Sequence, residues 1–299
     1  MNYNKQPIPI DEQVKKLKSR GLNIPDEAKA ASYLSNISYY RLRAYTYPFQ
    51  DNTQQDHPFE DNIHFDEIIK LYVFDRQFRL LVLDAIEKIE ISMRTQIIYQ
   101  WAMNHGSHWH LESALFRDSV QFARNFNKLQ QEVDRSVETF IDHYRTKYTH
   151  PPEPPSWMSL EVSSFGLLSL LFRNLKNGKE KKAVTKYYGL NDVGVLESWM
   201  HSFSNIRNIC AHHGRLWNRR LTAVIKLPTN TKNPFISNQN LLPYKIYPAL
   251  CCMKYILDII SPGHSYTEKL FKMMGECSLV QEKEMGFPAY WKDDKFWKI

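Results

Sequence analysis

Residues 65–104 read FDEIIKLYVFDRQFRLLVLDAIEKIEISMRTQIIYQWAMN, a stretch without a single glycine or proline. Leu83, Ile86, Met93 and Ile97, with Ile89 or Glu90 between them, recur in it at a spacing near 3.6 residues. That spacing is the period of a helix with one buried face. The stretch therefore predicts one long α-helix, or two nearly collinear ones, around which the rest of the chain packs.

Helical spacing continues on both sides of this stretch. Further helices are predicted over residues 11–20, after Pro25, and over 28–47, 118–148, 156–175, 179–188, 192–213, 248–260 and 266–274. Residues 220–247 hold three prolines and several asparagines, with a β-branched patch in TAVIKL, so a long irregular loop or a small hairpin is expected there. The predicted fold class is all-α, with additional N-terminal and C-terminal helices.

The sequence HPPEPP at residues 150–155 is the best candidate for a domain boundary, because prolines interrupt helices. It separates an N-terminal half, residues 1–150 with the long helix, from a C-terminal half, residues 151–299. A single composite domain is the alternative, since one helical body can reach this length.

Composition restricts the function classes. Lys and Arg number 39 against 32 Asp and Glu, a net charge of +7, which favours polyanionic partners. The four cysteines lack metal-ligand spacing, and no signal peptide or membrane span is visible, so we expect a reduced, soluble, cytoplasmic protein. His105, His108 and His110 lack a carboxylate or thiolate partner with zinc geometry, which favours an exposed loop and no metal. Walker, dinucleotide-binding and hydrolase motifs are missing.

The segment RNICAHHGRLWNR, residues 207–219, places two histidines and an Arg-Asn pair at the predicted end of a helix closed by Gly214. Asn208 and His212 share a helix face, whereas Arg207 lies about 140° around the axis from His212. RNA cleavage without a metal needs a group that exchanges protons and a cation that stabilises the crowded phosphate, and His and Arg supply both. The alternative is that His212 only stabilises the helix, because a histidine near a helix C-terminus interacts favourably with the helix dipole.

Arg207-Asn208-x-x-x-His212 resembles the Arg-x(4–6)-His signature of the HEPN superfamily. The wider chain resembles the Abi family of abortive-infection proteins, of the Abi-D and Abi-F kind. Besides RNICAHHGRLWNR, the resemblance rests on SYYRLRAYTYPF at residues 38–49 and on DAIEKIEISMRT at 84–95. The three blocks in this order span the chain from about residue 5 to residue 270.

The resemblance implies an all-α HEPN-like helical bundle that acts as an endoribonuclease in phage defence or in a toxin–antitoxin system. It assigns Arg207 to the scissile phosphate, His212 to proton transfer and Asn208 to orienting one of them, with 2′,3′-cyclic phosphate and 5′-hydroxyl products and no cofactor. The expected partners are RNA as substrate, a structured noncoding RNA as antitoxin, and a second copy in a homodimer. The alternative is a catalytically silent HEPN-fold scaffold bound to RNA.

Several neighbouring residues have two interpretations. His213 also satisfies the signature, so the choice between it and His212 stays open. Glu87, Glu90 and Arg94 form either a polar cluster facing the Arg207 helix or ordinary i to i+4 ion pairs. Tyr39 and Tyr40 are candidates to stack on single-stranded bases, whereas Tyr40, together with Tyr33 and Tyr47, also follows the spacing of core residues. The remaining candidates hold flanking RNA or are merely solvated: Arg215, Asn218, Arg219, Arg41 and Arg43.

Overall fold

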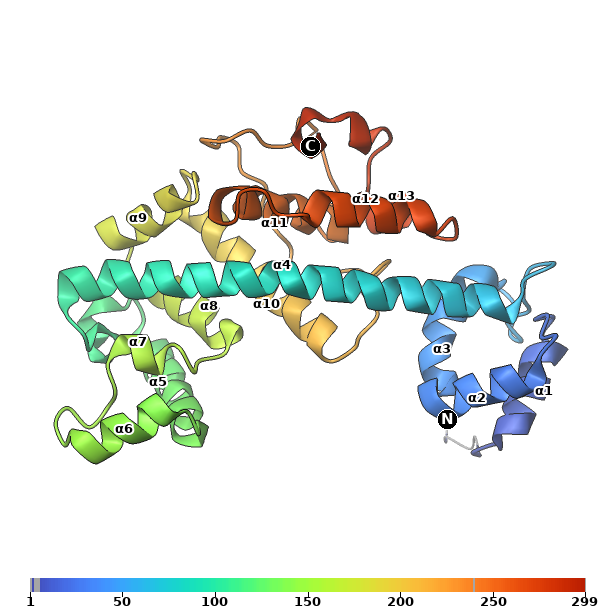
Figure 1. Cartoon of the computed structure of the whole chain (residues 1–299), viewed down its shortest axis with the longest axis horizontal. Coiled ribbons are helices and arrows are strands. Elements are labelled where there is room, and N and C mark those ends of the chain that lie inside the picture. Colours follow the sequence, from blue (N-terminus) through green and yellow to red (C-terminus); the bar gives the residue numbers. More distant parts are fainter. Residues whose placement is uncertain (1, 3–5, 239, 299) are drawn as a thin grey trace. The chain divides into compact units, whose positions relative to one another are not determined.

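The protein is described by a computed structural model that covers residues 2, 6–238 and 240–298. These residues form thirteen α-helices and a few short 3-10 turns, with no strand or sheet, which confirms the all-α prediction. Residues 65–104, which were predicted as one long helix or two nearly collinear ones, belong to one continuous helix, α4 (Phe65–His105; Figure 1). It ends where Gly106 adopts a φ of 85°, a conformation that glycine reaches without steric cost. Within the described ranges, no helix has the length and apolar character needed to cross a bilayer.

The chain divides into two compact units. The first comprises Met1–Phe78 and Phe271–Gln281, and the second comprises Arg79–Leu270 and Glu282–Ile299. The proline-rich segment at 150–155, predicted as the boundary, lies inside the second unit. Tyr144 donates its hydroxyl hydrogen to the carbonyl of Pro151 there, at 2.8 Å. The helices besides α4 are α1 (Ile10–Ser19), α2 (Glu27–Ile37), α3 (Tyr39–Thr46), α5 (Ser119–Arg135), α6 (Thr139–Lys147), α7 (Ser156–Ser159), α8 (Phe165–Asn174), α9 (Lys179–Tyr187), α10 (Val193–Ala211), α11 (Ile246–Ile260), α12 (Tyr266–Glu276) and α13 (Glu282–Met285).

In the first unit, α1, α2 and α3 pack with the beginning of α4. The continuous helix predicted over residues 28–47 is interrupted at Ser38, whose φ of 68° ends α2. The same serine begins α3, because its hydroxyl oxygen accepts a hydrogen bond from the backbone N–H of Arg41. Tyr45 is buried and donates to the buried carboxylate of Asp75 at 2.7 Å. The corner at Ser38 therefore sets how α3 leaves α2.

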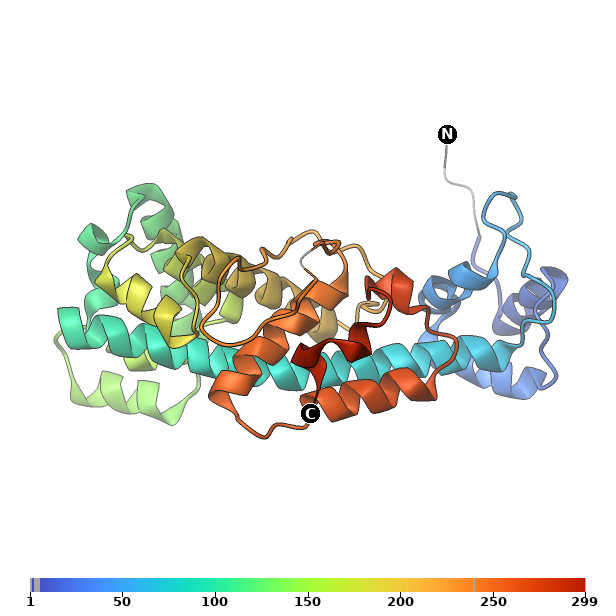
Figure 2. The same ribbon diagram turned by 90° about the horizontal axis from the view of Figure 1, so that it is seen from above.

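In the second unit, the predicted apolar stripe of α4 is buried at Ile86, Ile89 and Met93. The Trp101 ring lies edge-on to Phe172 of α8, with ring centroids 6.2 Å apart. Seen from above in Figure 2, α11 crosses over this part of α4. Residues 282–298 cover α11 with aromatic side chains, among which Trp297 donates to the Tyr247 hydroxyl at 3.0 Å.

Two more predicted helices are divided by short linkers. Residues 136–138 separate α5 from α6, and residues 160–164 separate α7 from α8. Ser164 caps α8, with its hydroxyl accepting from Leu167 N–H, while Glu132 of α5 accepts from both the N–H and the hydroxyl of Ser164 at 2.7 and 2.9 Å. Neither linker contains glycine or proline. The second break coincides with the Ser164 cap, whereas Glu138 makes no side-chain capping bond at the start of α6.

A buried ion pair joins α9 to α10. The fully buried ammonium of Lys181 lies 2.6 Å from the Glu197 carboxylate. It also donates to the carbonyls of Arg173 and Leu175, at 3.3 and 2.9 Å, where α8 ends. Burial lowers the pKa of Lys181, and the Glu197 carboxylate opposes that shift. One side chain therefore connects the ends of three helices.

The described residues of the irregular segment predicted at 220–247 form no hairpin. Leu221, Ala223 and Ile225 are buried while the residues between them are exposed, which is the alternation of a strand without a strand partner. Instead, α10 supplies the hydrogen bonds. Trp199 donates its indole N–H to the Lys226 carbonyl at 2.8 Å, and Ser198 accepts from the Lys226 N–H.

The histidine segment after α4 differs from the exposed loop that was predicted. His110 is buried, and the ring of His108 bonds to the Ser107 hydroxyl and the Glu153 carbonyl. His105 lies 3.2 Å from the Glu180 carboxylate. His105 and His108 thus connect the end of α4 to α9 and to the proline-rich segment, whereas His110 is enclosed beside Trp109. Burial, followed by the charge on His108, lowers the pKa of His110 from 6.5 to about 3.

We expect Lys181→Met to destabilise the second unit by about 3–5 kcal/mol, because it leaves the Glu197 carboxylate poorly paired. The double variant Lys181→Met/Glu197→Gln removes both charges and should recover most of that loss. Urea unfolding at pH 7 measures the free energy of unfolding of both variants. Equal stability of Lys181→Met and the unmodified protein would contradict a structural role for the pair.

The low pKa of His110 predicts a specific loss of stability in acid. The unfolded chain binds a proton at this side chain below pH 6.5, whereas the folded chain does not until about pH 3. Between pH 7 and 5, the free energy of unfolding should therefore fall by roughly 2 kcal/mol more in the unmodified protein than in His110→Phe. His143→Phe, at an exposed histidine of α6, is the control and should follow the unmodified protein.

Candidate functional site

Helix α10 positions the Arg207 motif. Asp192 caps its first turn by accepting from the Gly194 N–H at 2.7 Å. One face is buried through Leu196, Trp199, Met200, Phe203, Ile206 and Cys210, and it packs against α8, α9 and α11. Arg207 and Asn208 fall on the opposite face and are exposed. Burial of one face thus determines which motif residues reach the surface.

The end of α10 is a Schellman motif centred on the two histidines. His212 is the C-cap, and His213 adopts a left-handed φ of 57°. The N–H groups of His213 and Gly214 bind the carbonyls of Cys210 and Ile209, at 3.0 and 2.8 Å. The left-handed position expected for Gly214 is therefore occupied by His213, a residue type that tolerates it better than most.

Gly214 has a different role from the one predicted. A Cβ atom at this position would lie 3.2 Å from the Ile209 carbonyl oxygen and 3.3 Å from Ile209 Cγ2. The glycine permits the chain to pass close to the last turn of α10. Beyond it, Leu216 and Trp217 are buried, so the chain returns to the core directly after the histidines.

Arg207, Asn208 and His212 are gathered at this end of α10. The Arg207 guanidinium approaches the Asn208 side-chain oxygen at 3.5 Å, the limit of a hydrogen bond. The imidazole of His212 is exposed and has no hydrogen-bonding partner among the described residues. Asn208 therefore contacts the arginine, and the histidine is available to a ligand.

Arg207 lines an open groove with a volume of about 690 Å³. Glu90 and Arg94 of α4 line the same groove, 2.7 Å apart as an i to i+4 ion pair. Arg94 is 7% exposed and also donates to the Ser163 carbonyl at 2.9 Å. Two members of the candidate polar cluster therefore share the groove with Arg207, and they also form the ordinary ion pair. The third, Glu87, is exposed and does not line it.

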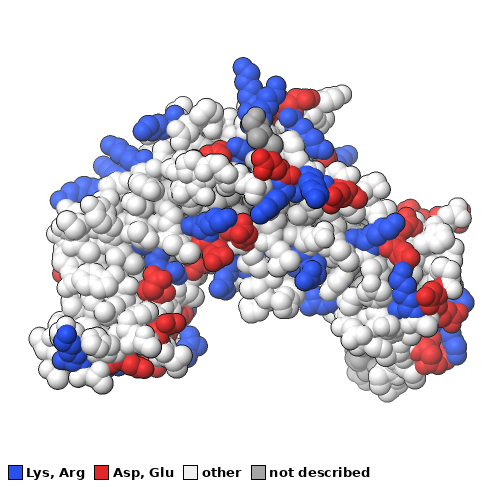
Figure 3. Space-filling model, viewed as in Figure 1, with Lys and Arg blue, Asp and Glu red and all other residues white. Residues whose placement is uncertain are grey.

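The charge of this groove is mixed. Its described lining contains three arginines, Arg94, Arg135 and Arg207, and four glutamates, Glu90, Glu132, Glu138 and Glu161. On the face shown in Figure 3, Lys and Arg atoms likewise alternate with Asp and Glu atoms. Positive potential at the groove is thus local to single arginines such as Arg207.

The flanking candidates lie after the helix end. A guanidinium nitrogen of Arg219 would be 3.4 Å from a Cβ at Gly214, so this arginine folds back toward the end of α10. Arg215 is half-buried, and Asn218 has a buried side-chain oxygen without a hydrogen-bond partner in the described structure. Arg41 and Arg43 belong to α3 in the first unit, where Arg43 lines a separate groove.

Sequence reasoning missed the groove residues outside α4 and α10. Glu132 and Arg135 come from the end of α5, and Glu161 comes from the linker before α8. These residues are far from Arg207 along the chain and carry no motif spacing. The described residues contain no group of three or more His, Cys, Asp or Glu side chains arranged to hold a metal ion.

Comparison with known proteins identifies a family. Residues 32–218 match a family whose description is Abi-like protein. That range includes the whole of α3, α4 and α10, with the Arg207 motif. Neither a curated protein nor a solved structure matches the sequence.

Two of the three groove arginines, Arg94 and Arg207, should differ in their contribution to stability. Arg94→Ala removes the partner of Glu90 and of the Ser163 carbonyl, so we expect a loss of about 1.5–3 kcal/mol. Arg207→Ala should change the free energy of unfolding by no more than about 0.5 kcal/mol, because its side chain is exposed. Thermal or urea unfolding of both variants checks this. A large loss of stability in Arg207→Ala would indicate that Arg207 has a structural role instead.

Proposed function

Because the chain belongs to the Abi-like protein family, we propose that it is a HEPN-type endoribonuclease that cuts RNA without a metal. We place it in phage defence by abortive infection, or in a toxin–antitoxin pair. The observation that carries this is the end of α10. The guanidinium of Arg207 and the imidazole of His212 are exposed there, and among the described residues their one hydrogen-bond contact is the marginal one between Arg207 and Asn208.

The chemistry follows from these two groups. The 2′-oxygen of a ribose attacks the adjacent phosphorus while its proton passes to a neutral imidazole. The bond from phosphorus to the 5′-oxygen then breaks, and the 5′-oxygen takes a proton from an imidazolium. Arg207 stabilises the added negative charge on the phosphate oxygens, and Asn208 orients Arg207. The products are a 2′,3′-cyclic phosphate and a 5′-hydroxyl.

This reaction uses one base and one acid. A homodimer would supply both as two copies of His212, which supports a composite site formed by two motifs. His213 is the alternative second group within one chain. RNA is the substrate in this proposal, and a structured noncoding RNA is the restraining partner.

A second candidate function is an RNA-bound scaffold without turnover. The observation that favours it is the groove charge, because four glutamates beside three arginines attract a polyanionic substrate weakly. In this case RNA affinity resides elsewhere on the chain, and Arg207 and His212 are not needed for the cellular effect.

Cleavage of a labelled single-stranded RNA in EDTA tests the nuclease. We expect the unmodified protein to make cyclic-phosphate ends, and Arg207→Ala or His212→Ala to slow the reaction by about 10²-fold or more. His143→Ala, at another exposed histidine, is the control.

His213→Asn separates the two histidines. Asparagine tolerates the left-handed backbone, so this variant removes the imidazole and keeps the helix end. Full activity of His213→Asn would assign proton transfer to His212 alone. RNA bound but left uncut by every one of these proteins would favour the scaffold.

A further inference from the structure

The first unit carries an open groove of about 960 Å³ that is separate from the Arg207 groove. Residues before and within α1 form one wall, and the corner between α2 and α3 forms the other. Its described lining includes three cations, Lys16, Arg20 and Arg43, and no carboxylate. The groove at Arg207 has more glutamates than arginines, so the two grooves differ in the sign of their charge.

The cations of this groove are not neutralised by the fold. Lys16 and Arg43 are exposed, and neither has an acidic partner among the described residues. Other lysines of α1 and α2 are paired: Lys15 with Glu12, Lys18 with Glu27 and Lys29 with Asp66. The unpaired positive charge of these helices is therefore concentrated where the groove lies, which is the arrangement that binds a chain of phosphates.

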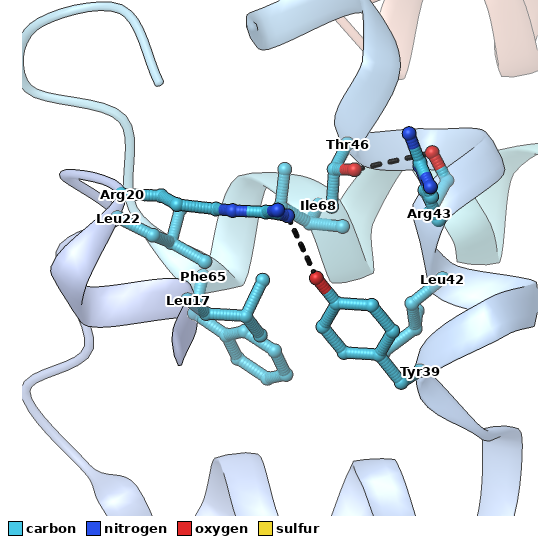
Figure 4. Close-up of a pocket in the computed structure, with 9 residues that line it drawn as sticks. All are labelled: Leu17, Arg20, Leu22, Tyr39, Leu42, Arg43, Thr46, Phe65 and Ile68. Carbon is cyan, nitrogen blue, oxygen red and sulfur yellow. Dashed lines mark hydrogen bonds between the residues drawn. The ribbon is translucent and has the colours of Figure 1, made fainter. Parts of the chain in front are cut away.

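Two adjacent tyrosines lie beside these cations. Tyr40 is 87% exposed, and it makes no ring contact within the described structure. Tyr39 is fixed, because its hydroxyl accepts a hydrogen bond from the Arg20 guanidinium at 2.9 Å. Figure 4 shows this bond joining the end of α1 to the start of α3.

The backbone that presents Tyr40 is constrained. Ser38 combines a φ of 68° with a ψ of 144°, a region that residues with a side chain rarely adopt. It turns the chain at the top of the groove and starts α3 with Tyr39 and Tyr40 in its first turn. The exposed ring is thus held on a helix, where little conformational freedom is lost when a ligand stacks on it.

We propose that this groove binds a single-stranded segment of RNA, with Tyr40 stacking on a base and Lys16 and Arg43 contacting phosphates. Single strands expose the faces of their bases, whereas a duplex hides them, so an exposed ring beside unpaired cations favours the single strand. The inference rests on the proposed function in taking RNA as the ligand. It adds a second contact region for that RNA, in a different unit from Arg207.

Binding of a fluorescein-labelled 12-mer of uridine to the full chain tests the inference, in the His212→Ala background that prevents cutting. Tyr40→Ala should weaken binding by roughly fivefold or more, and Tyr40→Phe should bind within about twofold of the parent. Tyr47→Ala, at an exposed tyrosine of the same segment outside the groove, is the matched control.

Salt dependence tests the cations. Lys16→Ala/Arg43→Ala should reduce the slope of log affinity against log salt by about 1.4, because two phosphate contacts are lost. Lys15→Ala, which removes the neighbouring paired lysine, should leave the slope unchanged. A photoreactive 4-thiouridine in the 12-mer should crosslink to the peptide that contains Tyr40.

The outcomes separate this inference from the nuclease. Crosslinks confined to the second unit, or equal RNA affinity of Tyr40→Ala and its parent, would contradict RNA binding in this groove. Neither result would contradict the proposed nuclease. Equal affinity for a duplex of the same length would overturn base stacking. If binding depends on Tyr40 but the unmodified protein, which retains His212, cuts no RNA, the groove is supported and the nuclease is contradicted.

Discussion

The ammonium of Lys181 is enclosed where α8, α9 and α10 meet, with the Glu197 carboxylate at 2.6 Å and two carbonyls of the α8 end as its other partners. A charge buried in this way requires its partners in fixed positions, since each displaced partner leaves polar groups unsatisfied. Glu197 is in the second turn of α10, so the pair fixes that helix near its start. Apolar packing then determines its rotation, which leaves Arg207 on the surface.

Arginines in and around the groove show how the same residue type serves two purposes. Arg94 is buried, and its charge is matched by Glu90 and by a backbone carbonyl, so its guanidinium holds α4 to the start of α8. Arg207, by contrast, is exposed, and its one hydrogen-bond contact among the described residues is with the side chain of Asn208. Exposure and partner count therefore separate a structural cation from one that is available to a phosphate.

The sequence predicted the long helix α4 and helix α10 well, because each has strong apolar periodicity and an identifiable end. It did not predict the interruption at Ser38 or the linker at 136–138, where no glycine or proline signals a break. The first coincides with the Ser38 cap of α3, whereas no side-chain cap begins α6 after the second. The burial of His110 could not be anticipated for a similar reason, since a polar residue type gives no sign of being enclosed.

Within the candidate site, the motif itself was visible and its surroundings were not. Arg207, Asn208 and His212 could be named from spacing, whereas Glu132, Arg135 and Glu161 line a groove with Arg207 only through tertiary packing. The mixed charge of that groove follows from those three residues together with Glu138, so a net charge of +7 was a poor guide to it.

Helix α10 ends with two adjacent histidines of opposite backbone handedness, right-handed at His212 and left-handed at His213. Tolerance to substitution should therefore differ between them for reasons of chirality alone. Position 213 accepts glycine, asparagine and aspartate most readily and rejects β-branched residues, whatever its imidazole does. Position 212 carries no such restriction. A selection from randomised codons at the two positions would then report backbone handedness at 213 and side-chain chemistry at 212.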